Sequence, residues 1–402
     1  MNEPIFIVGA PRSGTTLLAA MLAAHSQLSC GPETHFFRWL SEADIQALTA
    51  ADQWPEAAVD FVCTITRTNF PDHERKLLIE NYQVDREQVR EYLQAKPPSV
   101  AAMLASITES FMRHMGKTRW VEKTPDHIEY VSTIRQYFPN SPIIRILRDP
   151  RDIVLSLTNV PWGVSSIMEG LLFWKRQDEA SRTFFDTDPN SYTIRFEDLI
   201  QSPEEELAKL VKFIGESFEI SMLDTSQTGK LVNSRNVAWK NKSSQPLDRS
   251  RVEVWRTKMT VDQSRLAESV LGDRMDAYGY PRQHDFSRLG EIYPALQLAT
   301  KYSPSLEMIA AKGVRLWKTH ESEPVTVKIY LGDPENNGWM KGQPSEKIRD
   351  TMALSTKIVK AISSSNQDVY WIVDGNDEGW TGTCAFILKK LLNSSKIVPN
   401  PK

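Results

Sequence analysis

The chain has 402 residues, which is long for a single hydrophobic core and predicts two domains. Its hydrophobic fraction of 41% and charged fraction of 25% are typical of soluble globular proteins. The 48 basic and 51 acidic residues give a formal net charge of −3, which argues against a dedicated nucleic-acid binder, so any anion site must come from local clustering.

The cysteines and the N-terminus indicate where the protein works. Cys30, Cys63 and Cys384 are widely separated, which gives no disulfide framework and favours a reducing compartment. The chain enters an apolar run at Ile5 without a charged segment before it, so we expect no secretory signal. No apolar stretch approaches the roughly 18 residues that a membrane span needs. We therefore expect a cytoplasmic protein without a membrane span.

The first elements expected along the chain are a strand, a turn and a helix. Residues 5–8 form a short apolar, β-branched run, which is typical of a buried parallel strand. A turn follows at residues 9–14, and residues 15–24 are dense in Leu and Ala and predict a helix. Residues 35–118 are polar, with helical stretches and no clear strand.

Further strands and helices alternate along the next hundred residues. Strands are predicted at residues 120–121, 143–147 and 191–196, and helices at residues 149–158 and 203–214. Strands that alternate with helices indicate an α/β fold with a parallel β-sheet flanked by helices and joined by right-handed crossovers.

The periodic pattern weakens at residues 282–295, where we predict a domain boundary. The first domain would comprise residues 1–285, and residues 290–402 would form a smaller α/β domain of unknown function. The predicted strands and helices of this second domain cover residues 326–331, 345–362, 369–373 and 383–392.

The turn after the first strand has the features of an anion site. Residues 9–16 read Gly-Ala-Pro-Arg-Ser-Gly-Thr-Thr and open directly into the helix, where backbone N–H groups and the helix dipole favour a negative charge. The spacing of the two glycines is that of a nucleotide-binding P-loop, but Thr15 stands where that motif has lysine. Arg12 is the main cation instead, and Ser13, Thr15 and Thr16 supply hydroxyl donors. A glycine-rich turn without a ligand is the alternative.

Residues 11–18, Pro-Arg-Ser-Gly-Thr-Thr-Leu-Leu, resemble the 5'-phosphosulfate-binding loop of sulfotransferases. Residues 23–34 resemble tyrosylprotein sulfotransferases and their bacterial relatives, and the resemblance extends over residues 4–280. It implies a P-loop-type sheet and the co-substrate 3'-phosphoadenosine 5'-phosphosulfate (PAPS), but it does not identify the acceptor. Because no secretory signal or membrane anchor is expected, we favour a carbohydrate, a lipid or a small metabolite over a protein tyrosine as the acceptor. The residues implied to hold the 5'-phosphosulfate are Arg12, Ser13, Gly14, Thr15 and Thr16.

A second anion site is expected where the predicted strand at residues 143–147 ends. Arg148 can bind a phosphate as a fork, and Ser156 lies about two helical turns further along. This spacing resembles the 3'-phosphate motif of sulfotransferases, in which an arginine and a serine eight positions later hold the 3'-phosphate. The alternative is a charged helix start in which Arg145 and Arg151 form local ion pairs with Asp149 and its neighbours.

Sulfuryl transfer needs a base for the incoming hydroxyl and cations on the leaving phosphate. The resemblance assigns the base to Glu33, because the related enzymes carry a glutamate at this position. His35 is the rival, and a surface carboxylate or helix cap is a third interpretation of Glu33. Lys123 would neutralise the oxygen that bridges phosphorus and sulfur, with Arg12 as a further catalytic cation; a surface ion pair with Glu122 or Asp126 is the alternative for Lys123.

Other segments carry weaker patterns. Lys240 and Lys242 lie where relatives have a loop that closes on the nucleotide, although a solvated charge run fits them equally well. Residues 374–379 begin like a calcium loop, but Ala385 takes the place of the required glutamate, so calcium is not expected. Four tryptophans could stack on a sugar but are more often core residues, namely Trp39, Trp54, Trp162 and Trp174.

We find no metal-ligand spacing in the sequence, and sulfuryl transfer does not require a metal. Two other functions stay open at this point. A P-loop kinase or NTPase would need a lysine at the position of Thr15 and an acidic partner for magnesium. A catalytically inactive nucleotide-binding scaffold would have lost the base or the phosphate ligands, whereas Glu33, Lys123, Arg12 and Arg148 are all present.

Overall fold

The computed structural model describes most of the first 283 residues and four short strands beyond them. The described ranges are 3–66, 76–160, 162–164, 167–232, 243–283, 314–317, 325–330, 369–374 and 397–399. The chain divides into two compact units. The first comprises residues 1–148 and 177–252, and the second comprises residues 149–176 and 253–402.

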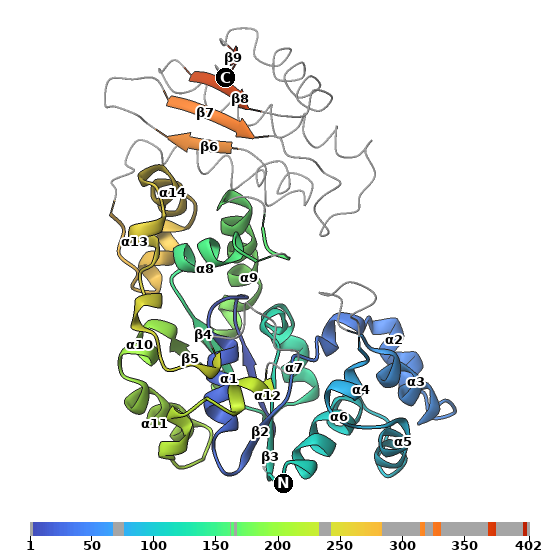
Figure 1. Cartoon of the computed structure of the whole chain (residues 1–402). Coiled ribbons are helices and arrows are strands. Elements are labelled where there is room, and N and C mark those ends of the chain that lie inside the picture. Colours follow the sequence, from blue (N-terminus) through green and yellow to red (C-terminus); the bar gives the residue numbers. More distant parts are fainter. Residues whose placement is uncertain are drawn as a thin grey trace. The chain divides into compact units, whose positions relative to one another are not determined.

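The first unit is built on a five-stranded parallel sheet in the order β2-β3-β1-β4-β5 (Figure 1). The strands are β1 (Ile5–Val8), β2 (Leu28–Cys30), β3 (Arg119–Lys123), β4 (Ile143–Leu147) and β5 (Ser191–Arg195). Four of them lie where the sequence predicts strands, so the expected parallel α/β sheet is confirmed. β2 was not predicted, because three residues are too short to display a period.

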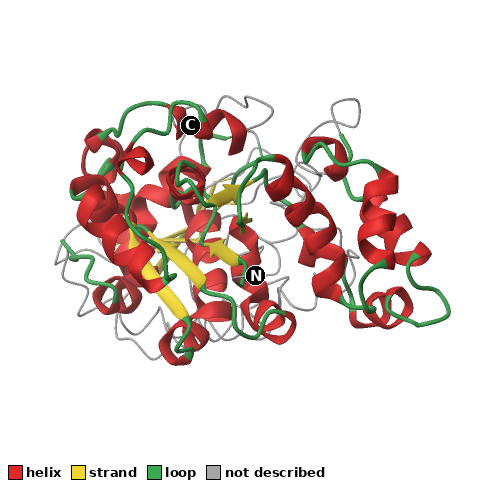
Figure 2. Ribbon diagram, turned by 90° about the horizontal axis from the view of Figure 1, so that it is seen from below, coloured by secondary structure: helices red, strands yellow, loops and turns green. Residues whose placement is uncertain are grey.

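Side chains alternate across β1, so both faces of the sheet are buried. Ile5 and Ile7 join an apolar cluster with helices α1 (Thr15–Ala23) and α11 (Pro203–Phe213). Phe6 and Val8 join a second cluster on the other face. That cluster includes residues of α6 (Val100–His114) and α7 (Val131–Tyr137). Helices therefore flank the sheet on both sides, as Figure 2 shows.

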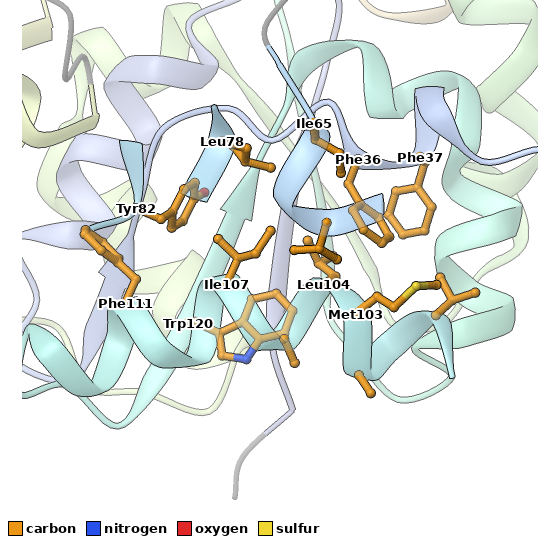
Figure 3. Close-up of a cluster of buried hydrophobic side chains, with 14 of the residues drawn as sticks. Phe36, Phe37, Ile65, Leu78, Tyr82, Met103, Leu104, Ile107, Phe111 and Trp120 are labelled. Atoms are coloured by element: carbon orange, nitrogen blue, oxygen red, sulfur yellow. The ribbon is translucent and has the colours of Figure 1, made fainter. Parts of the chain in front are cut away.

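The segment after β2 is anchored in the second cluster. Phe36 and Phe37 begin the short 3-10 helix η1 (Phe36–Trp39) and are fully buried. Figure 3 shows their rings beside Leu104 and Met103 of α6. The residues just before them, which include two of the predicted site residues, are thereby tied to a rigid helix.

Within the described part of residues 35–118 the regular elements are helices joined by turns and loops, as predicted, apart from one isolated bridge between Thr66 and Leu77. Besides η1 and α6, its helices are α2 (Glu42–Leu48), α3 (Glu56–Thr64), α4 (Leu78–Asn81) and α5 (Arg86–Gln94). The remaining elements of the first unit are η3 (Pro125–Tyr130), α10 (Phe196–Gln201), η4 (Ile220–Leu223), α12 (Thr228–Val232) and η6 (Arg249–Arg251). Helix α9 (Ile167–Thr187) has residues in both units.

The second unit contains helices α8 (Pro150–Leu157), α13 (Trp255–Lys258) and α14 (Val261–Ala277). It also contains a sheet in the order β6-β7-β8-β9, in which β6 is antiparallel to β7 and the other pairs are parallel. These strands are β6 (Val314–Trp317), β7 (Val325–Tyr330), β8 (Val369–Asp374) and β9 (Ile397–Pro399). β7 and β8 lie at the two predicted C-terminal strands.

Several predictions for the C-terminal part fall outside the described residues. These are the domain boundary between residues 285 and 290, the helices at residues 345–362 and 383–392, and the loop at residues 375–379. The division into domains at that boundary stays a prediction.

Candidate active site

The strand order brings the segments that follow β1, β3 and β4 to one edge of the sheet. β1 lies between β3 and β4, and because all strands are parallel, their carboxyl ends meet at the same edge. Ligands of open α/β sheets bind at this kind of switch point. The loop after β1 and the end of β3 are joined there by a hydrogen bond from the Gly9 N–H to the Pro125 carbonyl at 3.3 Å.

The loop at residues 9–14 has the backbone of an anion cradle. Arg12 has a φ of +76° and Gly14 a φ of +110°, and α1 begins at the next residue, Thr15. A Cβ on Gly14 would lie 2.5 Å from Cδ2 of Phe196, so no other residue fits without a shift. The Ser13 hydroxyl is fully buried and has no hydrogen-bond partner in the structure. A buried, orphaned hydroxyl in this loop fits an oxygen of a bound phosphate.

Two further arginines, Arg148 and Arg251, lie beside Arg12 of this loop. Arg148, which follows β4, is buried and donates to the carbonyls of Arg12 at 3.0 Å and of Arg251 at 2.7 Å. The guanidinium groups of Arg148 and Arg251 lie 4.5 Å and 5.5 Å from the centre of the Phe196 ring. Burial, and then the charges of Arg251 and Arg148, lower the pKa of Arg12 to about 10. Because like charges repel, such a cluster is suited to bind an anion.

Sequence reasoning missed Arg251. It lies in η6, more than a hundred residues from Arg148, in a polar stretch without a recognisable motif. The signal was the pair Arg249 and Arg251, which reads as an ordinary surface charge run. Only the fold shows that Arg251 is the arginine that lies over the ring of Phe196.

The predicted base and the predicted catalytic lysine are in direct contact. Nζ of Lys123, at the end of β3, lies 2.6 Å from Oε1 of Glu33 and 3.4 Å from Oγ1 of Thr16. Lys123 is fully buried and Glu33 is 5% exposed. Glu33 is therefore not a surface carboxylate, and Lys123 does not form a surface ion pair, which were the alternatives that the sequence left open. Side chains alternate along β3, so Lys123 and its neighbour Glu122 point to opposite faces of the strand.

His35 lies on the other side of Glu33. Its Nε2 is 3.6 Å from Oε2 of Glu33, and its Nδ1 is 3.1 Å from Oδ1 of Asp126. Burial disfavours the charged ring, but the carboxylate of Asp126, its hydrogen bond with the ring and the nearby carboxylate of Glu33 outweigh it and raise the pKa of His35 to about 9. The pKa of Asp126 falls to about 2, because the His35 charge outweighs the effect of burial.

A buried carboxylate fastens the Glu33 segment to β3. Glu122 accepts hydrogen bonds from the hydroxyls of Thr34 at 2.7 Å and Thr124 at 2.5 Å, and lies 3.0 Å from Nδ1 of His127. Burial opposes the charged form, but His127 and these hydroxyls lower the pKa of Glu122 below its usual value. The backbone N–H of Thr34 donates to Oγ1 of Thr124 at 3.0 Å. The network fixes the spacing between the segment of Glu33 and the end of β3.

The remaining residues of the second predicted anion site have other environments. Arg151 is buried, pairs with Asp149 at 2.7 Å and Glu268 at 3.2 Å, and stacks on Trp255. The alternative of local ion pairs is therefore correct for Arg151. Arg145 lies within β4 and donates to Thr193 at 3.1 Å. Ser156 lies on α8 in the second unit, so its pairing with Arg148 stays a prediction.

Two of the tryptophans have core-like packing, which the sequence favoured. Nε1 of Trp54 donates to the carbonyls of Leu93 and Lys96, and Trp174 is buried with its ring edge-on to Tyr278. Lys240 and Lys242 lie outside the described residues. Within the described ranges, no group of three or more His, Cys, Asp or Glu side chains could hold a metal ion. In the same ranges, no helix combines the length and the apolar character that crossing a bilayer requires.

The parallel sheet, the glycine-bounded loop and the arginine cluster define an α/β protein of the phosphate-binding-loop class with a buried acid–lysine pair at the anion site. The family model described as "Sulfotransferase family" matches residues 4–219, which is more than half of the chain. The protein therefore belongs to the sulfotransferase family and is an enzyme of that family.

Individual relatives are distant. The nodulation protein NoeE of Sinorhizobium fredii is 23% identical over 70% of this chain and 67% of its own length. Protein-tyrosine sulfotransferase 2 of Gallus gallus is 26% identical over 54% of this chain and 53% of its own length. Among solved structures, the sulfotransferase domain of the Synechococcus PCC 7002 olefin synthase is 19% identical and covers 67% of this chain and 95% of its own, with a TM-score of 0.45.

Proposed function

We propose that this protein transfers a sulfuryl group from PAPS to a hydroxyl or amine acceptor, with Glu33 as the base. The observation that carries the proposal is the buried contact between Glu33 and Lys123, 2.6 Å apart and beside Thr16 in the first turn of α1. A carboxylate that can take a proton and a cation that can stabilise a leaving phosphate stand next to each other there.

The reaction assigns one task to each of these groups. Glu33 accepts the proton of the acceptor hydroxyl, whose oxygen forms a bond to sulfur as the bond between sulfur and the bridging oxygen breaks. Lys123 and Arg12 stabilise the negative charge that develops on the departing 5'-phosphate. Positioning and electrostatics are the main contributions in such in-line transfers.

The sulfuryl donor is PAPS, and the binding residues divide between its two phosphate positions. Arg12, Ser13, Gly14, Thr15 and Thr16 hold the 5'-phosphosulfate, which the orphaned Ser13 hydroxyl and the backbone of the loop support. Arg148 holds the 3'-phosphate, which the crowding of three guanidinium groups supports. The assignment of Ser156 to the same phosphate rests on the sequence spacing alone.

The acceptor in this proposal is a carbohydrate, a lipid or a small metabolite, which stays an expectation from the sequence. The segments expected to shape its pocket are residues 34–118 and the loop at residues 161–163, of which residue 161 lies outside the described ranges. A cytoplasmic location likewise stays a prediction from the sequence.

The proposal is tested by following the label of sulfur-labelled PAPS with a panel of acceptors: a phenol, an oligosaccharide, a glycolipid and a primary amine. We expect label in at least one acceptor, or in sulfate when water is the acceptor, together with an equal amount of released adenosine 3',5'-bisphosphate. The same panel with γ-labelled ATP tests the kinase alternative. Transfer from ATP and none from PAPS would contradict the proposal, and binding of PAPS without any turnover would favour the inactive scaffold.

A further inference from the structure

The two oxygens of Glu33 face two different cations. Oε1 lies 2.6 Å from Lys123, and Oε2 lies 3.6 Å from Nε2 of His35. The opposite edge of the His35 ring contacts both oxygens of Asp126, at 3.1 Å and 3.2 Å from Nδ1. A carboxylate, an imidazole and a second carboxylate thus form one chain of contacts, with the ring between the two acids.

The backbone of His35 is held in an unusual conformation. Its φ is +51°, a left-handed value that residues other than glycine seldom adopt. The N–H groups of Thr34 and His35 both donate to Oγ1 of Thr124, at 3.0 Å and 3.3 Å. Phe36 follows immediately and is buried in the core. Such a conformation costs of the order of 1–3 kcal/mol and persists only where the surroundings hold it, most often at functional sites.

The charge of the His35 ring follows from the groups around it. The groups that face the ring are Asp126 from η3 and Glu33 from its own segment, while Lys123 and Arg12 act on Glu33 from β3 and the phosphate loop. The ring is positively charged at neutral pH, because the pKa of His35 is raised to about 9. A charged ring has no free lone pair, so the dominant form of His35 at neutral pH cannot accept the acceptor's proton.

We infer that His35 is a positioning residue: held by Asp126, its imidazolium fixes Oε2 of Glu33, so that Oε1 is the oxygen that receives the acceptor's proton. This inference rests on the proposed role of Glu33 as the base. When Lys123 turns its charge to the leaving phosphate, Oε1 loses its nearest cation, and weaker pairing of a buried carboxylate is costly. His35 stays in contact with Oε2 and holds the orientation of Glu33 until the proton arrives.

The first test reads the ring itself and does not depend on activity. The protein is labelled with ¹⁵N-histidine, and the His35 signal is assigned by its loss in His35→Gln. We expect a charged ring at pH 7 whose pKa falls by about one to three units in Asp126→Asn, because an opposite charge at contact has that effect. A smaller fall is expected in Glu33→Gln. Asp52→Asn, which removes an exposed carboxylate, is the matched control and should leave the His35 titration unchanged.

The result that would overturn the inference is equally direct. A ring that is neutral at pH 7, or one whose titration is the same in the wild type and in Glu33→Gln, does not act on Glu33. Thermal melting shows whether Asp126→Asn or Glu33→Gln is unfolded. If one of them is, the titration of His35 in the other variant is compared with that in the wild type.

The second test is the pH dependence of the release of adenosine 3',5'-bisphosphate from PAPS. We expect His35→Gln to lower turnover about tenfold and to move the acidic limb to higher pH, since a carboxylate that loses a neighbouring cation holds its proton more tightly. Asp126→Asn should move the basic limb to lower pH, because the imidazolium then loses its proton earlier. A merely structural role would lower turnover at every pH without moving either limb.

The outcomes separate the inference from the proposed function. If Glu33→Gln is inactive and His35→Gln keeps the wild-type profile, Glu33 remains the base and the inference about His35 fails. If Glu33→Gln keeps near-normal turnover while His35→Gln loses it, His35 is the base and both are wrong.

Discussion

At the scale of single residues, the environment of Glu33 determines which chemistry the site can perform. Glu33 is 5% exposed, and its carboxylate lies between the ammonium group of Lys123 and the ring of His35. Two neighbouring cations keep a buried carboxyl group ionised, and an ionised carboxylate can accept a proton. The arrangement favours Glu33 over His35 as the base.

Glu33→Gln tests this assignment. The substitution keeps the size and one oxygen of the side chain but removes its ability to take a proton at neutral pH. Turnover of PAPS should fall by about 10²- to 10⁴-fold, the usual contribution of a general base. Binding of adenosine 3',5'-bisphosphate, measured by calorimetry, should change little. Near-normal turnover of Glu33→Gln would show that another group is the base.

Lys123→Ala separates catalysis from binding. The charge of Lys123 is needed mainly when the bond to the bridging oxygen breaks, so the variant should lose far more in kcat than in the KM for PAPS. Steady-state kinetics over a range of PAPS concentrations measures both quantities. Should KM rise while kcat holds, Lys123 would be a binding residue only.

Arg148→Ala tests the 3'-phosphate site. We expect the affinity for adenosine 3',5'-bisphosphate to fall by about 1.5–3 kcal/mol, the value of a charged hydrogen bond. The loss for adenosine 5'-phosphate, which lacks the 3'-phosphate, should be clearly smaller, although Arg148 also bonds the backbone of Arg12. Arg148→Lys, which keeps the charge but not the fork, should lie between the wild type and the alanine variant. Equal losses for both nucleotides would show that Arg148 has another role.

At the scale of elements, the join between the phosphate loop and α1 positions the anion site. The helix starts at Thr15 because Gly14 adopts a left-handed conformation against the ring of Phe196. That same ring lies under Arg148 and Arg251, so one contact fixes both the loop and the arginine cluster.

Gly14→Ala should therefore disturb stability and binding together. The added Cβ would lie 2.5 Å from Phe196 at a φ of +110°, and we expect a loss of about 1–3 kcal/mol in the free energy of unfolding. Chemical denaturation measures this loss, and calorimetry should show weaker binding of adenosine 3',5'-bisphosphate. Gly116→Ala is the control for backbone strain, because Gly116 also has a positive φ, of +65°, but an added Cβ would meet nothing within 4 Å. It should lose some stability and bind adenosine 3',5'-bisphosphate like the wild type, and equal binding by the two variants would contradict the role of the Gly14 contact.

The elements that were predictable are those with a local pattern. The buried runs of β1 and β4 are apolar over their whole length apart from Arg145, and the glycine-bounded loop carries its own motif. β2 was not predictable, because it has only three residues. Its parallel pairing with β3 brings Glu33 to the edge of the sheet, where the sequence placed it only by resemblance.

At the scale of the whole molecule, the residues that were missed are those that only the fold brings to the site. Arg251 comes from η6 and belongs to no motif that names its partner. The sequence offered Asp126 and Glu122 only as alternative surface partners of Lys123, yet Asp126 contacts His35, and Glu122 is buried and bonded to Thr34 and Thr124. Sequence spacing predicts contacts within one element, whereas these contacts depend on how β1, β3 and β4 are ordered.

The central claim is that this sheet edge binds a nucleotide with phosphates on both the 3' and the 5' positions. Isothermal titration calorimetry of the full chain with adenosine 3',5'-bisphosphate, and separately with ATP, tests it most directly. We predict binding of the first nucleotide with a dissociation constant on the order of micromolar and no measurable binding of ATP. Tight binding of ATP, or equal affinity for both nucleotides, would contradict the account.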